Sequence, residues 1–261
     1  MKILCLSDLH LNPSETDDFL ISKVFSTEMA KVHQIVIKNN PDVIILTGDT
    51  VFNYQIQYLD IICSAMFGDD IPVMLCLGNH ETWGFTVEYA QFLLSNQMTI
   101  EGKEPQKNIF HLDIGETYEH DNVQFVGGML FFDGSMRFKE DQQLTPWNGW
   151  QDWRITNVER YEKICNDYIE RFASNIKPGK SIMLCTHHLS NEKLNGHEPS
   201  VYSFYSGVKD ISSRIDFDKS KDHWLICGHT HKRVINEISP GFHGINVGSD
   251  YGKILSYSFT I

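Results

Sequence analysis

The chain has 261 residues, of which 41% are hydrophobic and 21% are charged, and its net charge at pH 7 is −12. This composition is typical of soluble globular proteins, and no apolar run approaches the roughly 18 residues that a membrane-spanning helix needs. The acidic balance, without any Lys/Arg-rich run, excludes extended nucleic acid as an expected partner. Because charged Asp8 follows the first apolar run without a signal-peptide cleavage site, we expect a cytoplasmic protein of one domain, residues 1–261, with no membrane association.

Five short apolar runs, rich in β-branched residues, leucine and cysteine, each end in polar side chains. They read ILCLSDLH, VIILTGDT, PVMLCLGNH, SIMLCTHH and WLICGHT, and they begin at residues 3, 43, 72, 181 and 224. Runs that are apolar throughout indicate strands buried on both faces. Amphipathic stretches with helical spacing occupy residues 17–39, 54–67, 86–97 and 156–176. Because strands alternate with helices, the sequence predicts an α/β sheet.

Beyond His231 the pattern changes to strands alone, VINEI, HGINV and ILSYSFTI, joined through glycine and proline turns. We expect these strands to be antiparallel and to form a second sheet or to extend the first. The polar residues that end parallel strands meet in one crevice, so the five separated clusters are expected to form a single site.

The side chains in these clusters are metal ligands by type. Asp8 and His10 flank Leu9, so an extended chain would point both side chains the same way. Asp49 follows Gly48, and its carboxylate has two oxygens that can bridge two cations. The full set is Asp8, His10, Asp49, Asn79, His187, His229 and His231. One zinc ion takes about four ligands, so this set predicts two divalent transition-metal ions that share Asp49. Oxygen and nitrogen ligands without thiolate suit manganese, iron or zinc.

Taken together, these clusters resemble the motifs of the calcineurin-like metallophosphoesterases. The family pattern D-x-H, G-D, G-N-H-[ED], H and G-H-x-H is present at residues 8–10, 48–49, 78–81, 187 and 228–231. The resemblance implies an α/β fold of the metallo-dependent phosphatase type, a four-layer α-β-β-α sandwich in which two mixed sheets are flanked by helices.

The resemblance also implies roles for the matched residues. It assigns Asp8, His10, Asp49 and His231 to the first metal ion, and Asp49, Asn79, His187 and His229 to the second. It places His80 against the substrate, where the family uses this histidine to stabilise the transition state or to protonate the leaving oxygen. We favour His187 over the adjacent His188, although Leu189 stands where the family usually has proline, and we expect Glu81 to support the turn or its histidine.

Substrate recognition is expected from residues outside these clusters. An aromatic-rich segment at about 131–160 is a possible substrate-capping insertion, in which Arg137, Arg154 and Trp150 are candidate substrate-binding residues. Arginine pairs with phosphate, and an aromatic face can stack on a base. The other interpretation, which the residues leave open, is that these aromatic side chains pack onto the core. A second irregular stretch, residues 190–208, connects two clusters and therefore borders the crevice.

The function implied by the resemblance is hydrolysis of a phosphomonoester or phosphodiester of a small molecule or nucleotide. The protein phosphatases of the family carry G-D-x-V-D-R-G, whereas this chain has Phe52 and Asn53 at the second aspartate and the arginine, which disfavours that group. The alternatives are a nuclease or a nucleotide pyrophosphatase of the same fold. A non-catalytic metal-binding scaffold is disfavoured because every ligand position is filled.

Overall fold

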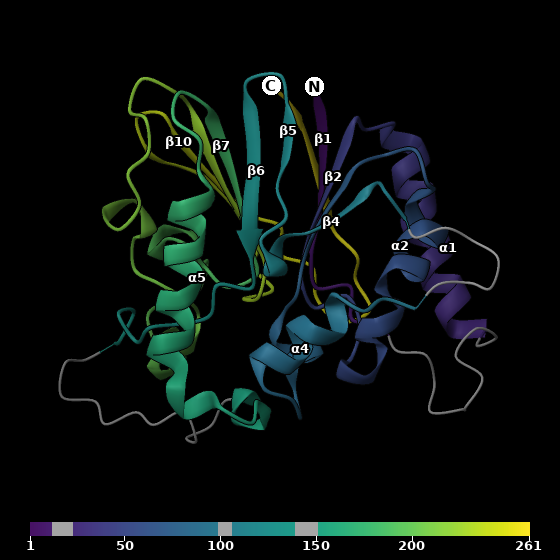
Figure 1. Ribbon diagram of the computed structural model, residues 1–261, viewed down its shortest axis with the longest axis horizontal. Coiled ribbons are helices and arrows are strands. Elements are labelled where there is room, and N and C mark those ends of the chain that lie inside the picture. The colour runs from purple at the N-terminus through teal and green to yellow at the C-terminus, as the bar shows by residue number, and fades with distance from the viewer. Residues whose placement is uncertain (12–22, 99–105, 139–150) are drawn as a thin grey trace.

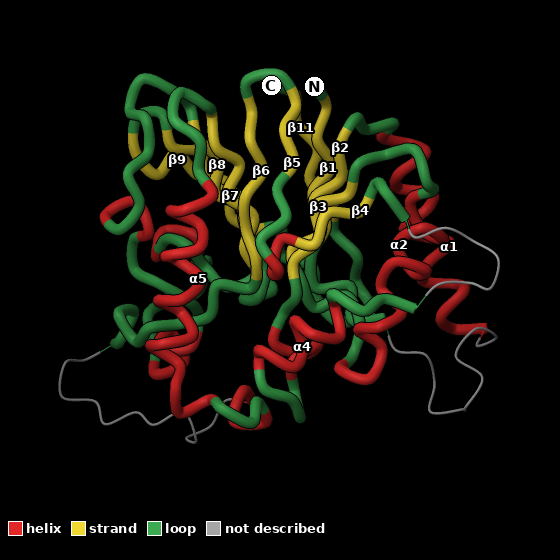
Figure 2. The backbone as a smooth tube through the Cα atoms, in the orientation of Figure 1, coloured by secondary structure: helices red, strands yellow, loops and turns green. Residues whose placement is uncertain are grey.

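A computed structural model of the chain describes residues 1–11, 23–98, 106–138 and 151–261. Two sheets pack face to face, and helices lie on their outer sides (Figures 1 and 2). The predicted four-layer arrangement is confirmed.

The first sheet has the strand order β11-β1-β2-β3-β4. Its strands are β1 (Lys2–Leu6), β2 (Val43–Thr47), β3 (Val73–Cys76), β4 (Ile109–His111) and β11 (Ser256–Thr260). The strands β1 to β4 are parallel, and β11 pairs with β1 in the antiparallel direction. This sheet is therefore mixed, and three of the five predicted motif strands lie side by side in it.

The second sheet has the order β5-β6-β7-β8-β10-β9. Its strands are β5 (Tyr118–His120), β6 (Val123–Gly128), β7 (Ser181–Thr186), β8 (His223–Cys227), β9 (Val234–Ser239) and β10 (Phe242–Asn246). The strands β6, β7, β8 and β10 are parallel, whereas β5 and β9 pair antiparallel at the two edges.

The C-terminal strands depart from the sequence prediction in one respect. They divide between the sheets: β9 and β10 extend the second, and β11 extends the first. The prediction that all three are antiparallel additions is wrong for β10, which runs parallel to β8. The reason is that β9 and β10 form an antiparallel pair at the sheet edge, so that β10 returns in the direction of β8.

The helices match the predicted amphipathic stretches. In Figure 1, α1 (Lys23–Asn39) and α2 (Leu59–Phe67) lie outside the first sheet, and α5 (Tyr161–Asn175) lies outside the second. The predicted helix at 54–67 begins as a 3₁₀-helix, η1 (Asn53–Tyr58), and α4 (Val87–Leu94) is shorter than predicted. Residues 17–22 of the first predicted helix lie outside the described residues. No helix in the described ranges is long and apolar enough to cross a bilayer.

The five motif strands β1, β2, β3, β7 and β8 are buried on both faces, as their apolar sequences predict. In β1, Ile3 and Cys5 pack in the layer between the sheets, while Leu4 and Leu6 pack toward the helices. All six cysteines are buried and free: Cys5, Cys76, Cys185 and Cys227 lie in the motif strands, and Cys63 and Cys165 lie in α2 and α5. The chain termini meet at one end of the sandwich, where the amino group of Met1 donates to the Ile261 carbonyl at 2.9 Å. The motif residues follow the opposite, carboxyl ends of the parallel strands.

Candidate metal centre

Five of the seven predicted ligands adopt the left-handed backbone conformation, which is unusual for residues other than glycine. Positive φ angles occur at Asp8 (52°), His10 (45°), Asp49 (50°), His229 (69°) and His231 (55°). The expectation that Asp8 and His10 alternate along an extended chain is therefore wrong. The chain turns instead, and the backbone N–H groups of Asp8 and His10 donate to the carbonyls of Gly48 and Asp49 at 3.0 and 2.8 Å. Aspartate and histidine tolerate this conformation better than most residues, and such strain concentrates at functional sites.

The first group of predicted ligands gathers despite this difference. Side-chain atoms of Asp8, His10, Asp49 and His231 all lie within 4.8 Å of one another. The His231 Nδ1 atom lies 3.1 Å from a carboxylate oxygen of Asp250, so Nδ1 carries the proton and donates it. The lone pair of His231 Nε2 then faces Asp8 Oδ1 at 3.5 Å and His10 Nε2 at 3.3 Å. A lone pair beside a carboxylate forms a donor set for a cation.

The second group is arranged in the same way. His187 Nδ1 lies 2.9 Å from the Thr47 carbonyl and His229 Nε2 lies 3.2 Å from the Tyr205 carbonyl, so these nitrogens donate. The other nitrogens, His187 Nε2 and His229 Nδ1, lie 3.2 Å apart and 2.8 and 3.1 Å from Asn79 Oδ1. Three lone-pair atoms thus converge with no proton between them. Such atoms repel one another unless a cation lies among them.

Asp49 connects the two groups. Its Oδ2 atom lies 3.5 Å from His187 Nε2, and the carboxylate also belongs to the group that contains Asp8 and His231. Its Oδ1 atom accepts from the backbone N–H of His80 at 3.0 Å, which fixes the orientation of the carboxylate. Asp49 is therefore placed to contact both of the predicted metal positions.

Burial shifts the pKa values of these groups in the directions that favour their neutral forms, up for the aspartates and down for the histidines. Burial raises the pKa of Asp8 to about 6, and burial together with the carboxylates of Glu81 and Asp8 raises the pKa of Asp49 well above its usual value. Burial lowers the pKa of His10 to about 2 and the pKa values of His187 and His229 well below the usual range. Neutral imidazole is the form that ligates metals, and a bound cation would stabilise the ionised carboxylates. The donor set therefore fits two metal ions.

Glu81 supports the turns that carry Asp49 and Asn79. Its buried carboxylate accepts backbone N–H groups from Thr50 at 2.6 Å, Val51 at 2.8 Å, Gly78 at 2.8 Å and Asp49 at 3.1 Å. Of the two roles expected from the sequence, the structure favours support of the turn. Close packing here also requires Gly78, because a Cβ atom at this position would lie 2.1 Å from Asp49 Oδ1.

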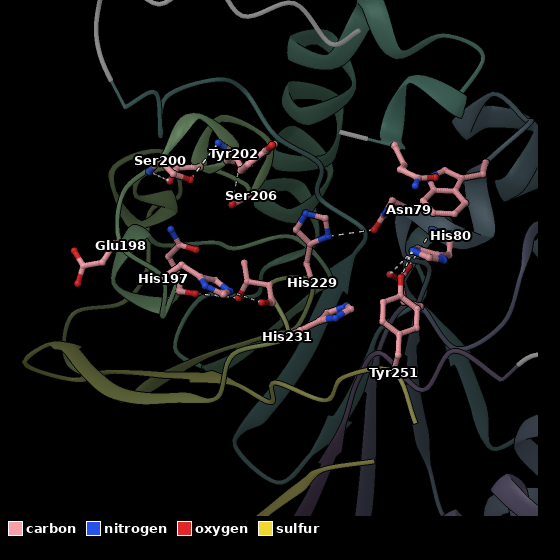
Figure 3. Close-up of a pocket in the computed structure, with 16 residues that line it drawn as sticks. Asn79, His80, His197, Glu198, Ser200, Tyr202, Ser206, His229, His231 and Tyr251 are labelled. Atoms are coloured by element: carbon pink, nitrogen blue, oxygen red, sulfur yellow. Dashed lines mark hydrogen bonds and ion pairs between the residues drawn. The ribbon is translucent and has the colours of Figure 1, made fainter. Parts of the chain in front are cut away.

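The side chain of His80 lies beside the predicted metal ligands and faces Tyr251, whereas the Asn79 amide faces His187 and His229 (Figure 3). Both residues belong to the short helix α3 (Asn79–Thr82). The His80 ring packs against Trp83 with 3.7 Å between ring centroids, and its Nε2 atom lies 3.7 Å from Asp49 Oδ2. Burial lowers the pKa of His80 to about 3, so the unliganded ring is neutral.

Two pockets meet at His80 and Trp83. The larger has a volume of about 870 Å³ and runs from Asp49 and Asn79 to a polar wall (Figure 3). That wall includes Asn195, His197, Glu198, Ser200, Tyr202 and Ser206. Residues of the predicted border stretch 190–208 thus line the pocket, whereas Tyr205 within this stretch is buried. The smaller pocket, of about 400 Å³, is lined by Phe52, His80, Trp83, Gly84, Trp153 and Arg154.

The candidate substrate-binding residues have different positions. Arg154 lines the smaller pocket, where its guanidinium lies 4.9 Å from the centroid of the Trp83 ring. Arg137 lies over the ring of Phe204 at 5.4 Å and is absent from the described residues that line either pocket. Trp150 lies outside the described residues. Phe131 and Phe132 are fully buried, as the core-packing interpretation expected.

The geometry also separates His187 from its neighbour. His188 also belongs to a possible ligand group with His187 and His229, and its Nδ1 atom faces a carbonyl, that of Met129 at 3.3 Å, as His187 Nδ1 faces that of Thr47. His187 is the histidine whose Nε2 atom approaches both Asn79 and Asp49. This placement supports the sequence preference for His187.

Sequence reasoning missed Asp250 and Tyr251. Asp250 orients His231, and the Tyr251 hydroxyl lies 3.3 Å from His80 Nε2. Although Tyr251 is exposed overall, partial burial of its phenol and the carboxylates of Asp49 and Asp8 raise its pKa to about 12, so the phenol keeps its proton. The only local signal is a turn composition, Gly248 to Gly252, that nothing in the sequence connects to the ligand clusters.

Comparison with known proteins identifies the family. Residues 1–233 match the family model described as calcineurin-like phosphoesterase. The chain belongs to this family. It is therefore a metal-dependent hydrolase, as the motifs predicted, and the match includes every predicted metal ligand.

Solved structures share the fold of this calcineurin-like phosphoesterase. A phosphopantetheinyl hydrolase from Mycobacterium tuberculosis is 14% identical, with a TM-score of 0.65 over 98% of this chain and 95% of that one. A dimetal phosphatase from Danio rerio is also 14% identical, with a TM-score of 0.51 over 95% and 87% of the two chains. At this identity the likeness shows the fold alone. The comparison with curated proteins gives no match.

Proposed function

We propose that the protein hydrolyses phosphoesters of small molecules with two divalent transition-metal ions, manganese, iron or zinc. Asp8, His10, Asp49 and His231 would hold the first ion, and Asp49 would share the second with a further set of ligands, Asn79, His187 and His229. The observation that carries the proposal is the convergence of His187 Nε2, His229 Nδ1 and Asn79 Oδ1 within 3.2 Å of one another, beside the Asp49 carboxylate.

The residues of the chain have separate tasks in this reaction. When bound, two such ions offset the charge of the phosphate and lower the pKa of the attacking water. Asp49 and its neighbours fix the position at which the phosphate binds. His80 faces the departing alcohol, and an anionic ester beside it would oppose the effect of burial and favour the protonated ring. Glu81 holds the backbone of Asp49 and Gly78 in place through its four accepted hydrogen bonds.

The two pockets favour a phosphodiester over a monoester. Both open on His80 and Trp83, and a diester has two organic groups to accommodate. The volume of the larger pocket is within the range of small-molecule binding sites. This size agrees with the expectation that the substrate is not a long nucleic acid. In the smaller pocket, Arg154 between Trp83 and Trp153 suits an aromatic or anionic group. A nucleotide diester, which has both an aromatic base and an anionic phosphate, is therefore the second candidate substrate.

Hydrolysis of two generic substrates tests the proposal. We expect the protein to cleave bis-p-nitrophenyl phosphate faster than p-nitrophenyl phosphate, to lose both activities on chelation, and to recover them when manganese is added back. Heat-unfolded protein treated with the same manganese solution is the control for catalysis by free metal. Full activity after complete removal of the metal would contradict the proposed mechanism, and a clear preference for the monoester would contradict the diester assignment.

A further inference from the structure

The turn between β10 and β11 brings an unassigned side chain to the site. Asp250 and Lys253 close this turn, with Asp250 N donating to the Lys253 carbonyl at 3.2 Å and Lys253 N donating to the Asp250 carbonyl at 2.8 Å. Gly252, with φ of 70°, supplies the left-handed position that the turn needs. The turn lies beyond residues 1–233, the part that matches the family, so the family motifs give Tyr251 no role.

Tyr251 is fixed to the first ligand group by its backbone and by its ring. One carboxylate oxygen of Asp250 accepts the backbone N–H of Tyr251 at 2.8 Å and also the Nδ1–H of His231 at 3.1 Å. The phenol ring stacks on His10, with 4.2 Å between centroids and 21° between planes. The position of Tyr251 is therefore determined by the same residues that are proposed to hold the first metal ion.

The hydroxyl of Tyr251 faces the same space as His80. Its oxygen lies 3.3 Å from His80 Nε2, and both residues line the larger pocket, in which Tyr251 points toward His80 (Figure 3). Tyr251 as a whole residue is 60% exposed, so a ligand in the pocket can reach it. Two polar atoms at this separation can both lie at hydrogen-bond distance, about 2.8 Å, from one ligand oxygen that forms a triangle with them. Each would then contribute one hydrogen bond to that oxygen.

We propose that Tyr251 is a further catalytic residue, whose hydroxyl donates a hydrogen bond to the oxygen of the bound ester that also faces His80. The proposal rests on the proposed phosphoester hydrolysis and adds a residue to it. A phenol is protonated at neutral pH and donates one hydrogen bond. Tyr251 stabilises the negative charge that grows on this oxygen as the bond to phosphorus breaks, while His80 supplies the proton.

The variant Tyr251→Phe separates the hydroxyl from the ring, because phenylalanine keeps the stacking on His10. A hydrogen bond to a charged group is stronger than one between neutral groups, so we expect kcat/KM for diester hydrolysis to fall by roughly 10-fold or more, about 1.4 kcal/mol, with unchanged metal content. The matched control is Tyr257→Phe on β11, which packs against Phe259 and does not line the pocket among the described residues. Its kinetics should equal those of the wild type.

A double-mutant cycle with His80→Ala tests whether both residues act on one oxygen. We expect Tyr251→Phe to change the rate by a clearly different factor in the His80→Ala background than in the wild type, because the effects of substituting two residues that share a contact are not additive. Equal kinetics of Tyr251→Phe and wild type, or fully additive losses, would overturn the proposal. A loss of metal content in Tyr251→Phe would show that the residue only maintains the ligand geometry.

Binding of inorganic phosphate to the metal-loaded protein distinguishes this inference from the proposed function. Tyr251→Phe should weaken phosphate binding several-fold, whereas Tyr257→Phe should leave it unchanged. If the wild type binds phosphate in this tyrosine-dependent way but hydrolyses no ester, the proposed function fails and the assignment of Tyr251 as a phosphate contact stands. If phosphate binds equally well to both proteins, the assignment fails whatever the activity.

Discussion

Replacement of Asp49 by asparagine is expected to weaken both metal positions together and to reduce kcat/KM by about 10³-fold, ~4 kcal/mol. Asparagine keeps an oxygen for the backbone N–H of His80, which Asp49 Oδ1 accepts at 3.0 Å. It replaces the other oxygen, 3.5 Å from His187 Nε2, by an amide that donates to that nitrogen and occupies its lone pair. The change therefore removes the negative charge and blocks one histidine with little change in shape.

The comparison variant for Asp49→Asn is His231→Ala. His231 lies in the group with Asp8 and His10, so its loss should empty mainly the first metal position. Metal content and turnover of both variants, measured at several metal concentrations, distinguish a shared ligand from an unshared one. The bridging assignment is wrong if Asp49→Asn keeps both metal ions and near-normal turnover.

The variant His80→Ala is expected to keep two metal ions and to lose turnover by a factor of about 10² to 10⁴, the usual range for a positioned general acid. Successive residues of a helical turn point about 100° apart, and Asn79 and His80 both lie in α3. The Asn79 side chain therefore reaches His187 and His229, while the His80 ring lines both pockets. The loss should be smallest for nitrophenyl esters, whose leaving oxygen needs no proton, and largest for alkyl esters.

Two results would contradict this role of His80. A collapse of metal content in His80→Ala would identify the residue as a ligand. An equal loss of rate for good and poor leaving groups would identify it as an electrostatic stabiliser of the phosphate. In either case the proton on the leaving oxygen has another source.

The fold and the ligand groups were predictable because their signals are local. Each motif, an apolar strand followed by predicted metal-ligand residues, occupies fewer than ten residues, and each of the motif strands occurs where its sequence places it. Parallel strands then bring their carboxyl ends together without any long-range information. The layer between the sheets follows from the same pattern. An apolar strand has hydrophobic side chains on both of its faces, so one face packs against helices and the other against the second sheet.

The features that were missed depend on contacts between distant parts of the chain. The strands β4 and β5 have three residues each, and β6 ends in Gly127 and Gly128, so periodicity gives little signal. The left-handed turns at Asp8 and His10 follow from hydrogen bonds to residues 48 and 49 on the neighbouring strand end. Asp250 and Tyr251 reach the site only because β11 pairs with β1 and brings the preceding turn beside His10.

The number of metal ions bound at saturation tests the central claim most directly. Protein stripped by a chelator is dialysed against manganese, zinc or ferrous iron, and the bound metal is measured per chain together with the recovered hydrolysis of bis-p-nitrophenyl phosphate. The account predicts two ions per chain for the wild type, one for His231→Ala, and recovery of activity only as the second ion binds. A single ion per chain at saturation, with full activity, would contradict it.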